Sequence, residues 1–156
     1  MNPYERLLAA VTGPTWFGTI GRNVVTPLDR RLHGSRFAPT RLGTSLPLCF
    51  LTTTGNKSGE PRTTPLLYII DDKGSPAVVA TNWGGQHHPG WSFNLEADPV
   101  ATVEIAGSAS PVVARRATGD ELARLWSAFI ARWPNYAKYR DRADRDIRMY
   151  VLDPAA

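Results

Sequence analysis

Residues 48–70 read LCFLTTTGNKSGEPRTTPLLYII, and this stretch decides the fold. Two β-rich arms flank a short turn at residues 55–59 that contains two glycines, which predicts a β-hairpin. Lys57 lies on the turn and Arg62 follows it. A purely structural hairpin needs its glycines but not paired cations. We therefore expect the two cations, with amides at the strand ends, to bind a phosphate.

The chain beyond Gly43 continues in the same pattern of apolar alternation and turn signals. Strands are expected at 46–54, 62–70, 76–82, 100–106, 110–117 and 149–152. Helices are expected through 91–95, through 118–130 after a capping box at 118–121, and through 133–139. Six strands joined mainly by hairpins, with helices at the periphery, predict an antiparallel β-barrel of the α+β class for residues 43–156.

Residues 1–42 predict a helical segment that completes a single domain of 156 residues. Asn2 and Pro3 form a helix start, and apolar residues recur every four positions from Trp16 to Leu32, opposite several arginines. Such a basic amphipathic segment has three interpretations. It packs on the domain as a lid, lies on an anionic membrane surface as a peripheral contact, or serves as a partner helix.

The charge of the chain points to acidic partners. The formal net charge is +4 and the pI is about 9.6, which favours a phosphorylated cofactor, an anionic membrane face or nucleic acid. Nucleic acid is not expected, because the arginines are scattered and no recognition motif is present. Cys49 is the single cysteine. We therefore expect no intrachain disulfide, a buried thiol, and a cytoplasmic protein with contact at the inner membrane face as the alternative.

Several chemistries lack their residues in this sequence. His87 and His88 are adjacent and diverge in an extended loop, so no metal site is expected. No Gly-x-Ser-x-Gly elbow, Walker motif or Gly-x-Gly-x-x-Gly fingerprint is present. The remaining signals are the turn cations, the glycine-containing loop 82–85, and a short helix that begins near Trp91. Together they predict a site for a phosphorylated planar cofactor.

Three blocks resemble the deazaflavin-dependent nitroreductase family. Residues 51–66, LTTTGNKSGEPRTTPL, are similar to its signature. Residues 84–85, 89–95 (PGWSFNL) and 97–99 (ADP) resemble its second block, and residues 133–139 (WPNYAKY) resemble its C-terminal aromatic helix. The resemblance spans about residues 46–154.

The resemblance implies a split β-barrel that binds coenzyme F420, a deazaflavin with a phosphate and an oligoglutamyl tail. It further implies an oxidoreductase whose reduced cofactor donates hydride to nitroaromatic, quinone or enone-like acceptors. Carried over by position, the implied cofactor residues are Asn56, Lys57, Ser58 and Arg62 around the phosphate, Thr81, Asn82 and Trp83 along the ring, and Trp91 and Asn94 closing the cleft. Tyr136 is implied as the catalytic residue that faces the acceptor and helps to protonate the product, with Tyr139 nearby in the substrate site.

The sequence departs from the family at two positions and leaves alternatives open. Asn56 stands where members often carry a cation, and Trp83 where they often carry a lysine. One alternative is an oxidoreductase that uses flavin mononucleotide (FMN) on the same barrel. Another is a non-catalytic module that binds the deazaflavin at a membrane. The expected partner is a small or lipophilic acceptor, and the chain is expected to be a monomer or a homodimer.

Overall fold

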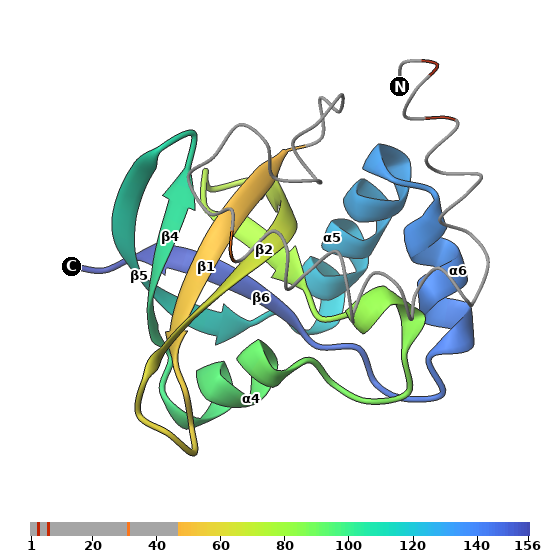
Figure 1. Cartoon of the computed structure of the whole chain (residues 1–156). Coiled ribbons are helices and arrows are strands. Elements are labelled where there is room, and N and C mark those ends of the chain that lie inside the picture. Colours follow the sequence, from red (N-terminus) through yellow and green to blue (C-terminus); the bar gives the residue numbers. More distant parts are fainter. Residues whose placement is uncertain (1–2, 4–5, 7–30, 32–46) are drawn as a thin grey trace.

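A computed structural model describes residues 47–156, together with residues 3, 6 and 31. Within 47–156 it contains a barrel of antiparallel strands with helices outside it (Figure 1). The strands are β1 (Leu48–Thr54), β2 (Pro61–Ile70), β3 (Pro76–Val79), β4 (Val100–Ile105), β5 (Ser108–Arg116) and β6 (Met149–Pro154). The helices are α4 (Gly90–Ala97), α5 (Gly119–Arg132) and α6 (Asn135–Arg142), and a 3₁₀ turn, η2, spans Asn82–Gly84. The predicted α+β barrel is confirmed, whereas the helical segment predicted for residues 1–42 lies outside the described residues.

The strand order around the barrel is β1-β2-β3-β6-β5-β4, and β4 pairs with β1 to close it. In the β1–β2 hairpin, Thr53 lies opposite Arg62. The third strand ends at Val79, not at 82 as predicted. Asn82 and Trp83 have φ values of 48° and 56°. These left-handed conformations are incompatible with an extended strand, and sequence pattern alone does not reveal them.

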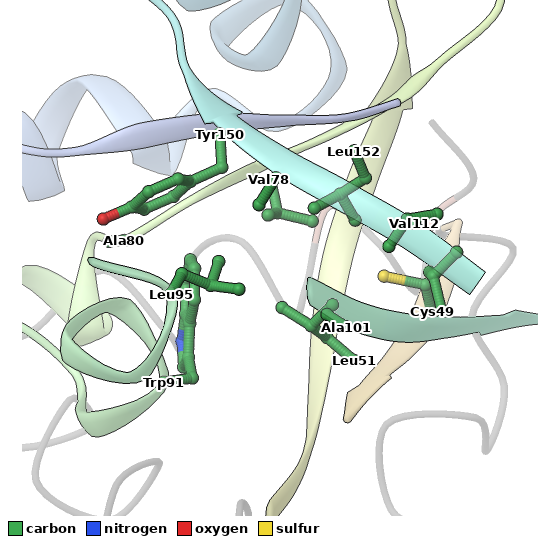
Figure 2. Packing of buried hydrophobic residues seen from close by; sticks show 12 residues of the cluster. Cys49, Leu51, Val78, Ala80, Trp91, Leu95, Ala101, Val112, Tyr150 and Leu152 are labelled. Atoms are coloured by element: carbon green, nitrogen blue, oxygen red, sulfur yellow. The ribbon is translucent and has the colours of Figure 1, made fainter. Parts of the chain in front are cut away.

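The strands bury side chains on both faces, and this creates two apolar clusters. The barrel core lies inside the barrel and includes α4; Figure 2 shows Trp91 and Leu95 of that helix facing Tyr150. The members of the barrel core are Cys49, Leu51, Val78, Ala80, Trp91, Leu95, Ala101, Val103, Val112, Ala114, Tyr150 and Leu152. The helix-side core lies between the barrel and α5 and α6. It contains Ala77, Val79, Ala117, Leu125, Phe129, Trp133, Tyr136, Tyr139, Ala143, Ile147, Met149 and Val151.

Helix α5 begins where the sequence predicts but without the predicted capping box. Thr118 is the N-cap residue, yet its side chain makes no capping hydrogen bond. The Glu121 carboxylate instead accepts two hydrogen bonds from Arg115, at 2.7 and 2.8 Å. A bidentate guanidinium pair is the stronger partner for a carboxylate, so Glu121 ties the helix to β5. None of the helices in the described part of the chain is both long and apolar enough to cross a bilayer.

Candidate functional site

A pocket of about 620 Å³ lies where the turn between β1 and β2 meets the start of α4. Figure 1 shows this turn and α4 together at one end of the barrel, away from α5 and α6. The lining residues are Gly55, Asn56, Lys57, Ser58, Arg62, Thr64, Gly90, Trp91, Phe93 and Asn94. The volume falls within the range of small-molecule sites. The structure therefore brings together six of the nine predicted cofactor residues.

The turn is shaped by hydrogen bonds within its own backbone. Gly55 N–H donates to the Glu60 carbonyl at 2.8 Å, and Gly59 N–H donates to the Gly55 carbonyl at 2.7 Å. Glu60 N–H donates to Oγ of Ser58 at 3.2 Å. The amides of Gly55, Gly59 and Glu60 are therefore engaged inside the turn. The predicted contribution of strand-end amides to phosphate binding stays a prediction.

The cations of the turn point into an open environment. Lys57 and Arg62 are both exposed, and within residues 47–156 neither forms an ion pair. The Arg62 Nη2 donates to Oγ of Ser58 at 3.4 Å, which holds the guanidinium on the side of the turn. Two positive charges on the wall of one pocket, neither of them in an ion pair within residues 47–156, make a favourable site for an anion.

The start of α4 forms the facing wall of the pocket. Gly90 and Trp91 line it, and the first backbone N–H groups of a helix favour an anion. Helix α4 is held by Tyr150, whose hydroxyl donates to the Ser92 carbonyl at 3.3 Å and to Glu96 Oε1 at 2.6 Å. Burial is the main cause, and the hydrogen bond to Glu96 the second, that raises the pKa of Tyr150 to about 12. The hydroxyl therefore remains a donor at neutral pH.

Asn94 lies in the pocket wall, but its polar atoms bond to the hairpin. Its Oδ1 accepts from the backbone N–H of Asn56 at 3.0 Å, and its Nδ2 donates to Oγ1 of Thr53 at 2.9 Å. The side chain is 7% exposed. The role predicted for it, closing the cofactor cleft, stays a prediction, since both ends of its amide already have protein partners.

Thr81, Asn82 and Trp83 do not line the pocket. They lie on the loop that follows β3, where Arg145 donates to the carbonyls of Ala80 at 3.0 Å and Thr81 at 3.1 Å. Trp83 is half-buried and packs against the helix-side core. Their predicted alignment along a cofactor ring stays a prediction.

Tyr136 and Tyr139 lie in the helix-side core, at 7% and 4% exposure. Their rings pack edge to face at 5.8 Å, and Tyr136 packs in the same way against Phe129 at 5.3 Å. Burial raises the pKa of Tyr136, so its phenol is neutral. The roles predicted for Tyr136 and Tyr139 at the acceptor stay predictions, and the three aromatic residues Trp83, Trp91 and Tyr136 divide between the two apolar clusters. Trp91 belongs to the barrel core, and the other two pack on the outer face of the sheet.

Sequence reasoning missed Phe93 as a pocket residue. Phe93 is 43% exposed, and it lines the pocket. The Arg148 guanidinium carbon lies 5.1 Å from the centre of its ring, and the His88 ring packs against it at 5.8 Å, edge to face. Helical spacing could have found it, because Gly90 and Phe93 are three residues apart and so share a face of α4.

Thiol and metal chemistry depend on Cys49 and on clusters of metal-ligating side chains. Cys49 is fully buried in the barrel core, and burial raises its pKa to about 12. Its thiol is therefore protonated, which confirms its interpretation as a core residue. Among the described residues, no three of the types His, Cys, Asp and Glu gather closely enough to hold a metal ion.

Gly55→Ala is expected to destabilise the turn. A Cβ at this position would lie 2.5 Å from Oγ of Ser58 and 3.1 Å from the Glu60 carbonyl oxygen. Relief of such crowding typically costs about 1–3 kcal/mol of unfolding free energy, measured by urea denaturation. Gly90→Ala is the matched control, since a Cβ there meets nothing within 4 Å. Equal stability of the two variants would contradict the close packing at Gly55.

The chain was compared with known proteins. It matches a family model described as F420H(2)-dependent quinone reductase over residues 25–154. An F420H(2)-dependent quinone reductase of Mycobacterium tuberculosis is 33% identical over 131 residues, which are 78% of this chain and 87% of the relative. A solved structure described as an F420-H2 dependent reductase is 34% identical, with a TM-score of 0.62, and the match covers 69% of this chain and 94% of that one. Another, described as a domain-swapped dimer, is 34% identical, with a TM-score of 0.63 and coverage of 69% and 80%.

Proposed function

The chain belongs to the F420H(2)-dependent quinone reductase family, and from this membership we propose that it transfers hydride from reduced coenzyme F420 to a quinone. It is thus an F420-dependent oxidoreductase. Because one family model matches residues 25–154, the match also supports the proposal that a single domain contains the whole site. The observation that carries the proposal is the meeting of the turn cations, Lys57 and Arg62, with the start of α4 in one pocket.

The residues of the pocket fit a phosphorylated cofactor with a planar ring. Lys57, Arg62 and the Ser58 hydroxyl supply donors for the phosphate, and the α4 N-terminus adds a favourable dipole. Trp91 and Phe93 supply an aromatic wall for the ring system. We propose that Asn56, Lys57, Ser58 and Arg62 hold the phosphate.

The chemistry divides between cofactor and protein. When bound, coenzyme F420 supplies the hydride, and a quinone that accepts a hydride and a proton becomes a hydroquinone. The protein positions the two partners and keeps water away from them. We propose that Thr81, Asn82 and Trp83 contact the ring, that Tyr139 borders the acceptor, and that Tyr136 supplies the proton. Nitroaromatic and enone-like acceptors belong to the same proposal.

A titration with coenzyme F420, followed by tryptophan fluorescence, tests the cofactor. Saturable quenching by F420 is expected, and quenching by FMN alone would contradict the proposal in favour of a flavin enzyme. The acceptor is tested separately, by adding menadione, a nitroimidazole or an unsaturated lactone to the protein with reduced F420. Oxidation of the reduced cofactor that depends on menadione is expected. Tight binding without any such oxidation would indicate a non-catalytic binding module instead.

Tyr136→Phe is expected to lower kcat by about 10²-fold, the lower end of the usual contribution of a positioned general acid, with little change in the Kd of F420. The substitution keeps the ring that packs against Phe129 and removes only the hydroxyl. Steady-state kinetics with menadione measure this effect, and Tyr139→Phe measures separately the contribution of the residue proposed to border the acceptor. If neither kcat nor Kd changes, Tyr136 is a packing residue only.

The assembly of the chain is also proposed. A structure that is 34% identical is described as a domain-swapped dimer, and this supports a homodimer for the present chain. Light scattering coupled to gel filtration would measure the mass. A mass equal to one chain of 17.1 kDa across the concentration range would contradict the dimer.

A further inference from the structure

The side chain of Asn94 ties α4 to β1 and to the turn of the β1–β2 hairpin. Its Oδ1 accepts from the backbone N–H of Asn56 at 3.0 Å. Its Nδ2 donates to Oγ1 of Thr53 at 2.9 Å, and the Thr53 hydroxyl donates over a longer 3.5 Å to the carbonyl of Arg62. These three hydrogen bonds, here called the relay, connect Asn56, which precedes Lys57, with the backbone carbonyl of Arg62.

The relay is buried, whereas the cations that it adjoins are not. Asn94 is 7% exposed and Thr53 is 1% exposed. Buried hydrogen bonds of this kind are costly to break, because the groups left behind find no water. Thr53 and Arg62 are also direct partners across the two strands. The backbone that carries these two exposed side chains is therefore held in place by buried hydrogen bonds.

We propose that Asn94 and Thr53 form a clamp that positions Lys57 and Arg62 relative to the N-terminus of α4. The clamp rests on the proposed function, in which these cations hold the phosphate of coenzyme F420. The oxygen and the nitrogen of the Asn94 side-chain amide both already bond to the protein. Asn94 is thus a positioning residue, and its influence on cofactor affinity passes through the turn and not through contact with the phosphate.

The test compares two ligands, coenzyme F420 and its deazaflavin core without the phosphate, by fluorescence titration. Asn94→Ala and Thr53→Val are each expected to raise the Kd of F420 about tenfold, as for loss of one buried hydrogen bond. The Kd of the core is expected to change less than about twofold, because no phosphate has to be positioned. Thr53→Ser keeps the hydroxyl and is expected to stay within about threefold of the wild-type chain.

A double variant separates positioning from direct contact. In a Lys57→Ala background, Asn94→Ala is expected to raise the Kd of F420 by less than about threefold, because one of the two positioned cations is gone and coupled residues are not additive. A full tenfold step in that background would assign Asn94 a direct contact and overturn the clamp. A parallel loss of affinity for F420 and for the core would overturn it as well, since that result indicates general damage to the fold.

Thr52→Val is the matched control for Thr53→Val. The Thr52 and Thr63 hydroxyls lie 2.8 Å apart and join the same two strands without reaching α4, so the Kd of F420 is expected to change less than about twofold. If Asn94→Ala does not fold, the comparison of Thr53→Val with Thr53→Ser carries the test, and equal affinities contradict the clamp. A wild-type chain that fails to bind F420 overturns the proposed function. A wild-type chain that binds F420 as tightly as the clamp variants overturns the clamp alone.

Discussion

Lys57→Ala and Arg62→Ala each weaken the binding of coenzyme F420 by about 1.5–3 kcal/mol, the usual range for hydrogen bonds to a charged group. Both side chains are exposed on the wall of the pocket, and within residues 47–156 neither is paired with a carboxylate. Because salt screens exposed charges, the loss is expected to be larger at low ionic strength than at 150 mM salt, where the Debye length is about 8 Å. Fluorescence titration at low ionic strength and at about 150 mM salt measures the loss of affinity.

The control for the turn cations is Lys73→Ala. Lys73 is exposed in the β2–β3 turn and does not line the pocket, so it tests the effect of net charge alone. Its removal is expected to leave the Kd of F420 nearly unchanged. Losses of the same size in Lys73→Ala and Lys57→Ala would mean that the overall charge of the chain attracts the cofactor and that the turn has no specific role.

Trp91→Ala is expected to lower the free energy of unfolding by about 3–5 kcal/mol, the usual cost of truncating a large buried aromatic residue. Trp91 is 4% exposed and packs edge to face on Tyr150 with ring centres 5.6 Å apart. Its loss opens a cavity between α4 and the barrel core, so helix α4 is expected to loosen and F420 binding to weaken as well. Chemical denaturation followed by circular dichroism measures the stability.

Trp91→Phe separates the role of Trp91 in packing α4 on the barrel core from its role in binding F420. Phenylalanine keeps most of the apolar contact with Tyr150, so a much smaller loss of stability is expected than with alanine. If Trp91→Phe is stable but binds F420 as weakly as Trp91→Ala, the indole itself contacts the cofactor. An unchanged stability in Trp91→Ala would contradict the packing of α4 on the barrel core.

Sequence reasoning predicted the barrel well because its information is local. The β-rich composition of β1 and β2, and the glycines of their turn, are visible in residues 48–70. The sequence also predicted that this turn and the start of α4 share one site, because the turn carries cations and a helix N-terminus favours an anion. The end of β3 was predicted wrongly because it depends on backbone dihedral angles, which the sequence pattern does not show.

The aromatic helix α6 shows what long-range packing adds to the sequence pattern. Tyr136 and Tyr139 are spaced three apart, which suits a ligand pocket and an apolar core equally well. Only the docking of α6 beside α5 decides between them, and it buries both rings. In the same way, the bonds of Arg145 to the carbonyls of Ala80 and Thr81 span 65 and 64 residues, so no local pattern contains them.

The two faces of β6 have a consequence for redesign of the chain. Tyr150 and Leu152 serve the barrel core and α4, whereas Met149 and Val151 serve α5 and α6. Substitutions that alter only the helix-facing side chains can therefore be accumulated with little effect on the pocket, provided that their volumes are conserved. A shift of β6 by one residue exchanges the two sets at once and removes the Tyr150 hydroxyl from Glu96. This strand thus accepts only volume-conserving substitutions on its helix-facing side, and it is intolerant of insertions or deletions.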